Sequence, residues 1–178
     1  MSEISLNIRP QELSILNRRT EELARRSHQD EAQSQGEKVD FLMFTINGVR
    51  YALEKHYVQE LHLEVRPIFV PCVPDFIKGI VNVRGDILSV MDLAAFVGNP
   101  ELKEQEQYPM FRVTQGKLDF GVLVESIEDI YPLSREDVHP FEVSDNARIN
   151  RFLIGMTHDM VHVLDGDGLL SDETLIVK

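Results

Sequence analysis

Several features that would point directly to a function are missing from this sequence. Its 178 residues include a single cysteine, Cys72, which cannot form an internal disulfide and so indicates a reducing compartment. The first residues contain no apolar signal region, and no apolar run approaches the roughly 20 residues that a membrane-spanning helix needs. We therefore expect a cytoplasmic protein that does not insert directly into a membrane.

Positive charge is also scarce. The chain carries 18 lysines and arginines against 30 aspartates and glutamates, which gives a formal net charge of −12. A protein that binds nucleic acid neutralises phosphates with a surplus of basic side chains. The composition therefore argues against nucleic acid and against anionic membrane surfaces as partners.

Sequence motifs that carry catalytic chemistry are absent as well. There is no Gly-x-Gly-x-x-Gly loop, no Walker loop and no Gly-x-Ser-x-Gly elbow, so we expect no cofactor and no catalytic residue. Cys72 lies between Pro71 and Pro74 without a nearby basic side chain to activate it, and we interpret it as a small buried hydrophobic residue. Carboxylates are frequent in residues 125–130 and 134–137, where we expect solvated side chains in loop or helix-like positions.

Two stretches imitate metal sites. The segment "HDMVH", residues 158–162, has the spacing of the zinc-protease pattern H-E-x-x-H, which requires two histidines one helical turn apart. The β-branched Val161 favours a strand instead, so His158 and His162 should lie on either side of a hairpin turn. The segment "DGDGLL", residues 165–170, lacks the later ligands of a calcium loop and is predicted to be a turn. We expect no metal site, and a metal-dependent hydrolase that uses the two histidines is the remote alternative.

The chain divides into an unusual beginning and an ordinary globular remainder. Residues 1–38 are polar, charged and free of aromatic side chains, whereas residues 39–178 should form the folded domain. Within the extension, "QELSILNRRTEELARR" predicts one amphipathic helix. Its apolar face would hold Leu13, Leu16, Thr20 and Leu23. Such a helix could lie on its own domain or dock on a partner, and the extension could also be disordered.

From residue 39 onward, apolar strands alternate with turn signals. Asn47 and Gly48 form a pair that tolerates positive φ, as a tight hairpin requires. Four hairpins are predicted, with turns at Asn47-Gly48, Arg84-Gly85, Gly116 and His158-Asp159. Short helical turns are expected at residues 54–61, 74–79 and 93–98, the last one ended by Gly98. This pattern indicates a mainly β protein built as small barrels or a sandwich, and a weak echo of 79–98 in 152–170 hints at two related units.

One hairpin carries an arginine at its tip. The segment "FIKGIVNVRGDILSVMDL", residues 76–93, is apolar except for a few residues around the turn, with Arg84 before Gly85. In one interpretation Arg84 is a surface side chain that snorkels or pairs with Asp86 or Asp92. In the other it is a contact point for a partner protein, because a planar guanidinium surrounded by apolar side chains makes directional bonds.

The same residues resemble a known family. The pattern Ile-x-Gly-x-x-Asn-x-Arg-Gly in residues 77–85, followed by a strand that ends in Asp-Leu, is similar to the signature of the CheW-like family of bacterial chemosensory coupling proteins. Residues 40–61, 117–133 and 153–165 also resemble the family's opening hairpin, middle segment and closing hairpin. The resemblance runs in order through about residues 40 to 171.

This resemblance implies a fold, a function and a site. The fold would be two intertwined five-stranded SH3-like β-barrels with short helices, here with the helical N-terminal extension. The function would be non-catalytic: the protein would bridge the cytoplasmic tips of chemoreceptors to the regulatory domain of a CheA-type histidine kinase. An adaptor of a non-flagellar pathway, such as one that governs pili, or a regulator that caps arrays is the alternative. The residues implied in partner contact are Val58, Glu60, Gly79, Asn82, Arg84 and Gly85.

Overall fold

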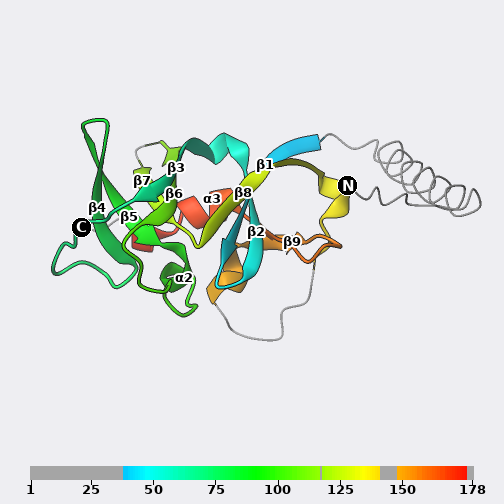
Figure 1. Ribbon diagram of the computed structural model, residues 1–178. Coiled ribbons are helices and arrows are strands. Elements are labelled where there is room, and N and C mark those ends of the chain that lie inside the picture. Colours follow the sequence, from blue (N-terminus) through cyan, green and yellow to red (C-terminus); the bar gives the residue numbers. More distant parts are fainter. Residues whose placement is uncertain (1–37, 117, 141–147, 176–178) are drawn as a thin grey trace, which may run out of the picture. The chain divides into compact units, whose positions relative to one another are not determined.

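The computed structural model describes residues 38–116, 118–140 and 148–175, which are drawn in colour in Figure 1. The extension and its expected amphipathic helix lie outside the described residues. A compact unit begins at Lys38. Among the described residues, no helix is long and apolar enough to span a membrane.

Two five-stranded sheets make up the fold, as predicted (Figure 1). The first contains β1 (Lys38–Ile46), β2 (Val49–Glu54), β8 (Ser126–Ser134), β9 (Leu153–Met156) and β10 (His162–Leu164), in the order β8-β1-β2-β10-β9. The second contains β3 (Val58–Val65), β4 (Ile77–Val83), β5 (Asp86–Asp92), β6 (Tyr108–Gln115) and β7 (Leu118–Leu123), in the order β3-β6-β7-β5-β4. The chain leaves the first sheet after β2, builds the whole second sheet, and returns at β8. We call the two sheets with their short helices the first and second units. Because the second is inserted between β2 and β8 of the first, the two units are intertwined.

Short helices link and close the strands. They are η1 (Lys55–Tyr57), α2 (Leu93–Phe96), η2 (Arg135–Asp137), η3 (Arg148–Phe152), α3 (Gly166–Leu170) and η4 (Glu173–Leu175). The predicted helical turn that Gly98 ends is α2, and Gly98 has the left-handed φ of +83° that favours glycine after a helix.

The weak echo between the two halves of the sequence corresponds to a repeated structural plan. In each sheet an antiparallel hairpin is followed by a short helix, β4-β5-α2 in one and β9-β10-α3 in the other. The second strand of each hairpin pairs in parallel with a strand of another hairpin, β5 with β7 and β10 with β2. Asp92 and Asp165 cap the two helices by accepting hydrogen bonds from Ala95 N at 3.2 Å and Gly168 N at 3.0 Å. Two barrels of related design thus follow one plan.

One continuous core joins the two units. Phe44 of β1 and Phe111 of β6 come from different sheets, and their ring centroids lie 5.1 Å apart. Phe96 of α2 contacts both Phe76 and Phe152, and it is fully buried. Removing a buried aromatic ring of this kind costs about 3 to 5 kcal/mol, so neither unit is expected to be stable without the other.

All four predicted hairpin turns are present. Asn47 and Gly48 both have positive φ, at +50° and +76°, and join β1 to β2. Gly116 has a φ of +60° between β6 and β7, and His158 lies between β9 and β10. The prediction is correct here because these turns depend on local backbone preferences alone.

Elsewhere the prediction was wrong in part. The short helical turn expected within residues 54–61 is present as η1, but it covers only 55–57, and β3 begins at Val58. Residues 74–79 form a turn followed by β4 rather than a helical turn. The carboxylates of 125–130 were placed in a loop or helix, yet most of this segment belongs to β8, which pairs with β1 over nearly its whole length. For β3 and β8, pairing with a strand distant in sequence overrides the local preference, whereas β4 is formed by the hairpin with β5.

Two smaller expectations were also wrong. Cys72 is exposed rather than buried, in a turn where its φ is +60°. The segment 165–170 is not a simple turn, because Asp165 caps the short helix α3. A side-chain cap on one turn of helix is a weak signal within a run of glycine and aspartate.

Candidate functional site

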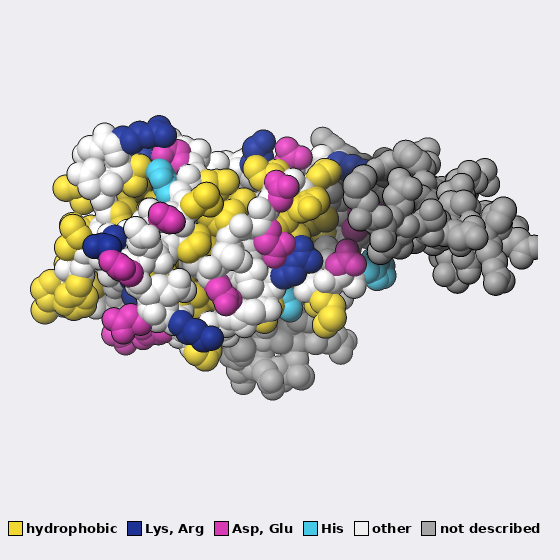
Figure 2. Space-filling model, viewed as in Figure 1, with side chains coloured by type: hydrophobic (Ala, Val, Ile, Leu, Met, Phe, Trp, Pro, Cys, Tyr) yellow, Lys and Arg dark blue, Asp and Glu magenta, His cyan; other side chains and the backbone are white. Residues whose placement is uncertain are grey.

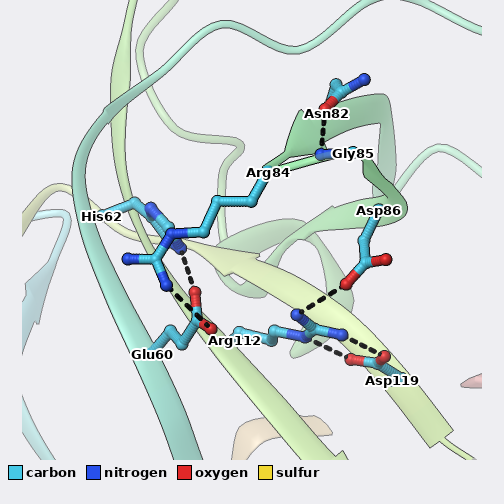
Figure 3. Close-up of polar contacts among 8 residues, drawn as sticks. All are labelled: Glu60, His62, Asn82, Arg84, Gly85, Asp86, Arg112 and Asp119. Carbon is cyan, nitrogen blue, oxygen red and sulfur yellow. Dashed lines mark hydrogen bonds and ion pairs between the residues drawn. The ribbon is translucent and has the colours of Figure 1, made fainter.

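The tip of the β4-β5 hairpin is a two-residue turn. Arg84 and Gly85 both have positive φ, at +52° and +101°, and Val83 pairs with Asp86 across the turn. Asn82 stabilises it, because its Oδ1 accepts a hydrogen bond from Gly85 N at 2.9 Å (Figure 3). The signature residues Asn82 and Gly85 therefore shape the turn, and Arg84 is the residue that the turn presents.

Arg84 extends from this turn toward β3. Its side chain is 82% exposed, and its Nη1 lies 3.9 Å from Oε1 of Glu60 (Figure 3). The other oxygen of Glu60 contacts Nε2 of His62 at 3.2 Å. Glu60 is only 26% exposed, so the carboxylate is held in place while the guanidinium is free to reorient. Of the alternatives that the sequence left open, a pairing of Arg84 with Asp86 or Asp92 is not formed, because its ion-pair partner is Glu60.

Both of those aspartates are occupied elsewhere. Asp92 is fully buried and accepts hydrogen bonds from two backbone amides, Ala95 N in α2 and Leu102 N in the segment that follows it. Asp86 points toward Arg112, whose Nη1 lies 3.5 Å from Asp86 Oδ2 (Figure 3). Arg84 consequently has no strong structural partner, and an exposed ion pair at 3.9 Å contributes little to stability.

We call the polar residues around the hairpin tip the cluster around Arg84; they are Glu60, His62, Asn82, Arg84, Arg112 and Asp119. Arg112 is its most firmly held member. It is largely buried on β6 and makes two parallel hydrogen bonds to Asp119 on β7, Nε to Oδ1 at 2.7 Å and Nη2 to Oδ2 at 2.6 Å. These bonds lower the pKa of Asp119, against the smaller opposing effect of burial. Arg112 also pairs in register with Glu60 on the neighbouring strand β3. A fixed guanidinium therefore lies beside the carboxylate that faces Arg84.

Two other residues implied in partner contact, Val58 and Gly79, lie outside the cluster around Arg84. Val58 begins β3 opposite Val113 and is half-buried against the main core, so much of its side chain serves packing. Gly79 is buried, with a φ of +137°, and a Cβ atom there would lie 2.1 Å from the carbonyl oxygen of Ile68. The segment before β4 crosses at this point and forms two hydrogen bonds with Ile80, at 2.8 and 2.9 Å. Gly79 thus acts by allowing this crossing.

Exposed apolar side chains also occur on the second sheet, on β3 and β5, and in the segment that crosses Gly79. On β3, Leu61 and Leu63 are 42% and 72% exposed, and Ile87 next to the hairpin tip is 69% exposed. The segment that crosses Gly79 presents Ile68 and Phe69, at 64% and 76%. The face drawn in Figure 2 shows exposed hydrophobic side chains among scattered charges of both signs, with no broad field of one sign. An apolar surface with a few directional polar groups is typical of protein-binding sites.

The histidines of the zinc-like motif do not form the predicted alternative site. His158 lies in the turn and His162 begins β10 opposite Met156, so the helix that H-E-x-x-H requires is not formed. The ring of His162 lies against Tyr51, with centroids 5.4 Å apart. Among the described residues, no three His, Cys, Asp or Glu side chains come together as a metal-binding group.

Sequence analysis found three members of the cluster and missed three others. Glu60, Asn82 and Arg84 were identified, and the structure brings them to one end of the second sheet. His62, Arg112 and Asp119 were missed. A usable signal existed for the last two, because an arginine and an aspartate flank the predicted turn at Gly116 at positions that face each other diagonally across a hairpin.

Comparison with known proteins identifies the family. Residues 40–174 match the model of the CheW-like domain, and the chain belongs to this family. It is 27% identical over 139 residues to the chemotaxis protein CheW of Klebsiella aerogenes, covering 76% of this chain and 84% of the relative. It is 22% identical over 142 residues to chemotaxis protein CheW of Bacillus subtilis, covering 78% and 90%. Protein FrzA of Myxococcus xanthus is 24% identical over 122 residues, covering 68% and 76%.

A solved structure has the same fold. The scaffolding protein TtCheW of Thermoanaerobacter tengcongensis superimposes with a TM-score of 0.62 at 21% sequence identity, covering 72% of this chain and 89% of that one. At this identity the likeness concerns the fold. It agrees with the two five-stranded sheets described above.

Proposed function

We propose that this protein is a non-catalytic coupling adaptor that binds the cytoplasmic tip of a chemoreceptor and the regulatory domain of a CheA-type histidine kinase. On this proposal it works in the cytoplasm, recruited to receptor arrays at the membrane. Membership in the CheW-like family and the names of the relatives support a scaffold role in chemosensory signalling.

The observation that carries the proposal is the exposed Arg84 beside the fixed carboxylate of Glu60. The fold does not need Arg84, because the turn is held by Asn82 and Gly85 and the ion pair is long and exposed. An exposed guanidinium on a sheet that also presents exposed apolar side chains suits a partner that offers a carboxylate or a carbonyl between apolar side chains. Helical receptor tips and a folded kinase domain can both present such groups.

Bridging explains why weak contacts with each partner would suffice for stable assembly. An adaptor that touches two partners in one array gains effective concentration, so weak pairwise affinities combine into stable assembly. A small difference in affinity between two states of the array would then be enough to shift kinase activity.

The test is a binding titration with purified components from the same organism. The full chain is titrated with the regulatory domain of the histidine kinase, and a receptor-tip fragment is then added as a second titrant. We expect micromolar binding to each partner and a ternary complex in which neither displaces the other. Binding to neither partner, or strict competition between them, would contradict the bridging role.

A second candidate is an adaptor of a different chemosensory pathway, or one that caps arrays. Its support is the relative named FrzA, whose name does not mention chemotaxis. The same titration with partners encoded beside the gene distinguishes the candidates. Preference for those partners over flagellar ones would favour the second candidate, and binding to the kinase without the receptor would indicate capping.

A further inference from the structure

Two histidines from distant parts of the chain meet on the first unit, away from the cluster around Arg84. His139 follows η2, and His158 lies in the turn between β9 and β10, 19 residues later. Their Nε2 atoms are 3.0 Å apart, and their rings are tilted by 61° with centroids 4.5 Å apart. Neither sequence analysis nor the partner-contact site accounts for this pair.

The backbone holds both residues in place. His139 forms an isolated bridge with Met156 through two hydrogen bonds, His139 N to Met156 O at 3.0 Å and Met156 N to His139 O at 2.9 Å. This approach requires Gly155, because a Cβ there would lie 2.5 Å from the carbonyl oxygen of His139. His158 comes two residues after Met156, in a turn tied by Thr157 N to Val161 O at 3.0 Å. The two imidazoles are thus presented together by fixed backbone rather than by chance side-chain contact.

The spacing of the two nitrogens fits a shared metal ion of defined geometry. With metal-to-nitrogen bonds of about 2.05 Å, two Nε2 atoms 3.0 Å apart subtend an angle of about 94° at the metal. The same separation is that of a hydrogen bond between the two rings, in which one Nε2–H donates to the other Nε2, so a bound ion would take the place of that proton. Imidazole nitrogens bind Cu²⁺ most strongly among the divalent first-row ions. An angle near 90° suits the square-planar or tetragonal geometry of Cu²⁺ and Ni²⁺.

The surroundings favour a cation and leave room for its other ligands. His158 lines a depression of about 340 Å³ whose rim includes Asp137 and Asp159. Arg50 also lines it, but its charge is matched by Glu128, with Nη2 to Oε2 at 2.7 Å. His139 does not line this depression, but both histidines are exposed, so water molecules can complete the coordination of an ion held by the two imidazoles. The two carboxylates lie on the rim beside His158.

We propose that His139 and His158 form a cis-bis-imidazole binding site for a divalent transition-metal ion of tetragonal preference, Cu²⁺ or Ni²⁺. It has two protein ligands, so it is a weak, exchangeable site and not a structural or catalytic metal centre. This inference is independent of the proposed function, since neither residue belongs to the cluster around Arg84.

The test uses the untagged full chain and Cu²⁺ as the probe. We expect one ion per chain in a calorimetric titration, and an electron paramagnetic resonance spectrum of a tetragonal site with two equivalent imidazole nitrogens. His139→Ala and His158→Ala should each weaken binding by about tenfold or more and leave the signature of a single imidazole. Thermal unfolding without metal should be unchanged in both variants, because both side chains are exposed.

Matched controls come from the other histidines. His56→Ala removes an exposed histidine that contacts Glu54 at 3.1 Å, and His28→Ala removes one in the extension. Both should bind Cu²⁺ as the unchanged chain does. The proposal is overturned if His139→Ala and His158→Ala bind with unchanged affinity, if the spectrum shows one imidazole in the unchanged chain, or if either control abolishes the site.

Discussion

At the scale of single residues, Arg84 can be tested against an arginine elsewhere in the fold with a nearly identical exposure and ion pair. Its side chain is 82% exposed and 3.9 Å from Glu60, and the side chain of Arg135 is 81% exposed and 3.9 Å from Glu54. We expect Arg84→Ala to weaken binding to the kinase domain or the receptor tip by about 1 to 3 kcal/mol, the range of a hot-spot residue. Arg135→Ala should leave both affinities unchanged, as measured by titration.

Stability distinguishes a contact residue from a structural one. Both variants should unfold at the same temperature as the unchanged chain, because exposed ion pairs of this length contribute about 0 to 1 kcal/mol. If Arg84→Ala unfolds early, or if both variants bind as the unchanged chain does, Arg84 is an ordinary surface arginine.

The Arg112–Asp119 pair predicts a specific pH dependence of stability. Because the folded state lowers the pKa of Asp119, the ionised carboxylate stabilises the fold above its unfolded pKa of about 3.9. That stabilisation is lost as the pH falls through the lowered folded-state pKa. Asp119→Asn should therefore be less stable than the unchanged chain at pH 7, by about 1 kcal/mol given the partial exposure of Asp119.

The difference between the two proteins should shrink below pH 4 and vanish once Asp119 is protonated in both states. Chemical denaturation at a series of pH values measures it. A difference that stays constant down to pH 2 would mean that the asparagine disturbs packing rather than removing a charge.

The residues of the candidate site differ in whether the sequence alone can identify them. Arg84 was identifiable because a charged residue in an apolar hairpin is locally unusual. Its ion-pair partner Glu60 was found only through the family resemblance, and Arg112 was not found. Glu60 and Arg112 lie side by side because β3 pairs with β6. A register between distant strands is set by the packing of the whole sheet, which no local pattern contains.

At the scale of elements, Gly79 should matter through the segment that crosses it. Gly79→Ala places a Cβ 2.1 Å from the Ile68 carbonyl oxygen, so the segment must shift and its two hydrogen bonds to Ile80 are strained. We expect a loss of about 1 to 3 kcal/mol in the free energy of unfolding. Partner binding should weaken as well, since Ile68 and Phe69 would lose their fixed position. Denaturation and the partner titration measure the two effects.

Gly48→Ala is the matched control for this element. Gly48 also has positive φ, at +76°, but a Cβ there meets nothing within 4 Å. It should cost only the backbone strain of about 1 to 2 kcal/mol and leave partner binding intact. Equal effects of the two substitutions on binding would show that the crossing segment is not part of the partner surface.

The elements that sequence analysis predicted correctly are those defined by residues close together in the sequence. The hairpins and α2 follow from turn residues and a helix stop, whereas β3 and β8 were mistaken for helix or loop. Both strands lie at the edge of their sheet and pair with one neighbour that is distant in sequence. Charged residues such as Glu60 and Glu128 stand among the apolar residues of these strands and weaken the alternation that marks a strand.

At the scale of the whole molecule, the shared core would allow the proposed bridging role. Each sheet repeats the same plan, yet the rings of Phe44 and Phe111 join them, so the two units form one folding unit. Surfaces at opposite ends of such a body are held at a fixed separation. A rigid spacing between two binding surfaces is what a bridging adaptor in an ordered array requires.

The boundary near residue 38 gives the last prediction. The core clusters of the described residues draw on side chains from Phe41 to Leu170, and β1, where the compact unit begins, already pairs on both edges. We propose that residues 1–38 form a separate extension, so removing residues 1–36 should change the melting temperature by less than about 2 °C. The same truncated protein should be titrated with both partners. Unchanged stability with weaker binding would identify the extension as a partner-docking segment. A much larger drop in melting temperature would contradict the boundary, because the face of Leu13, Leu16 and Leu23 would then have to pack on the domain.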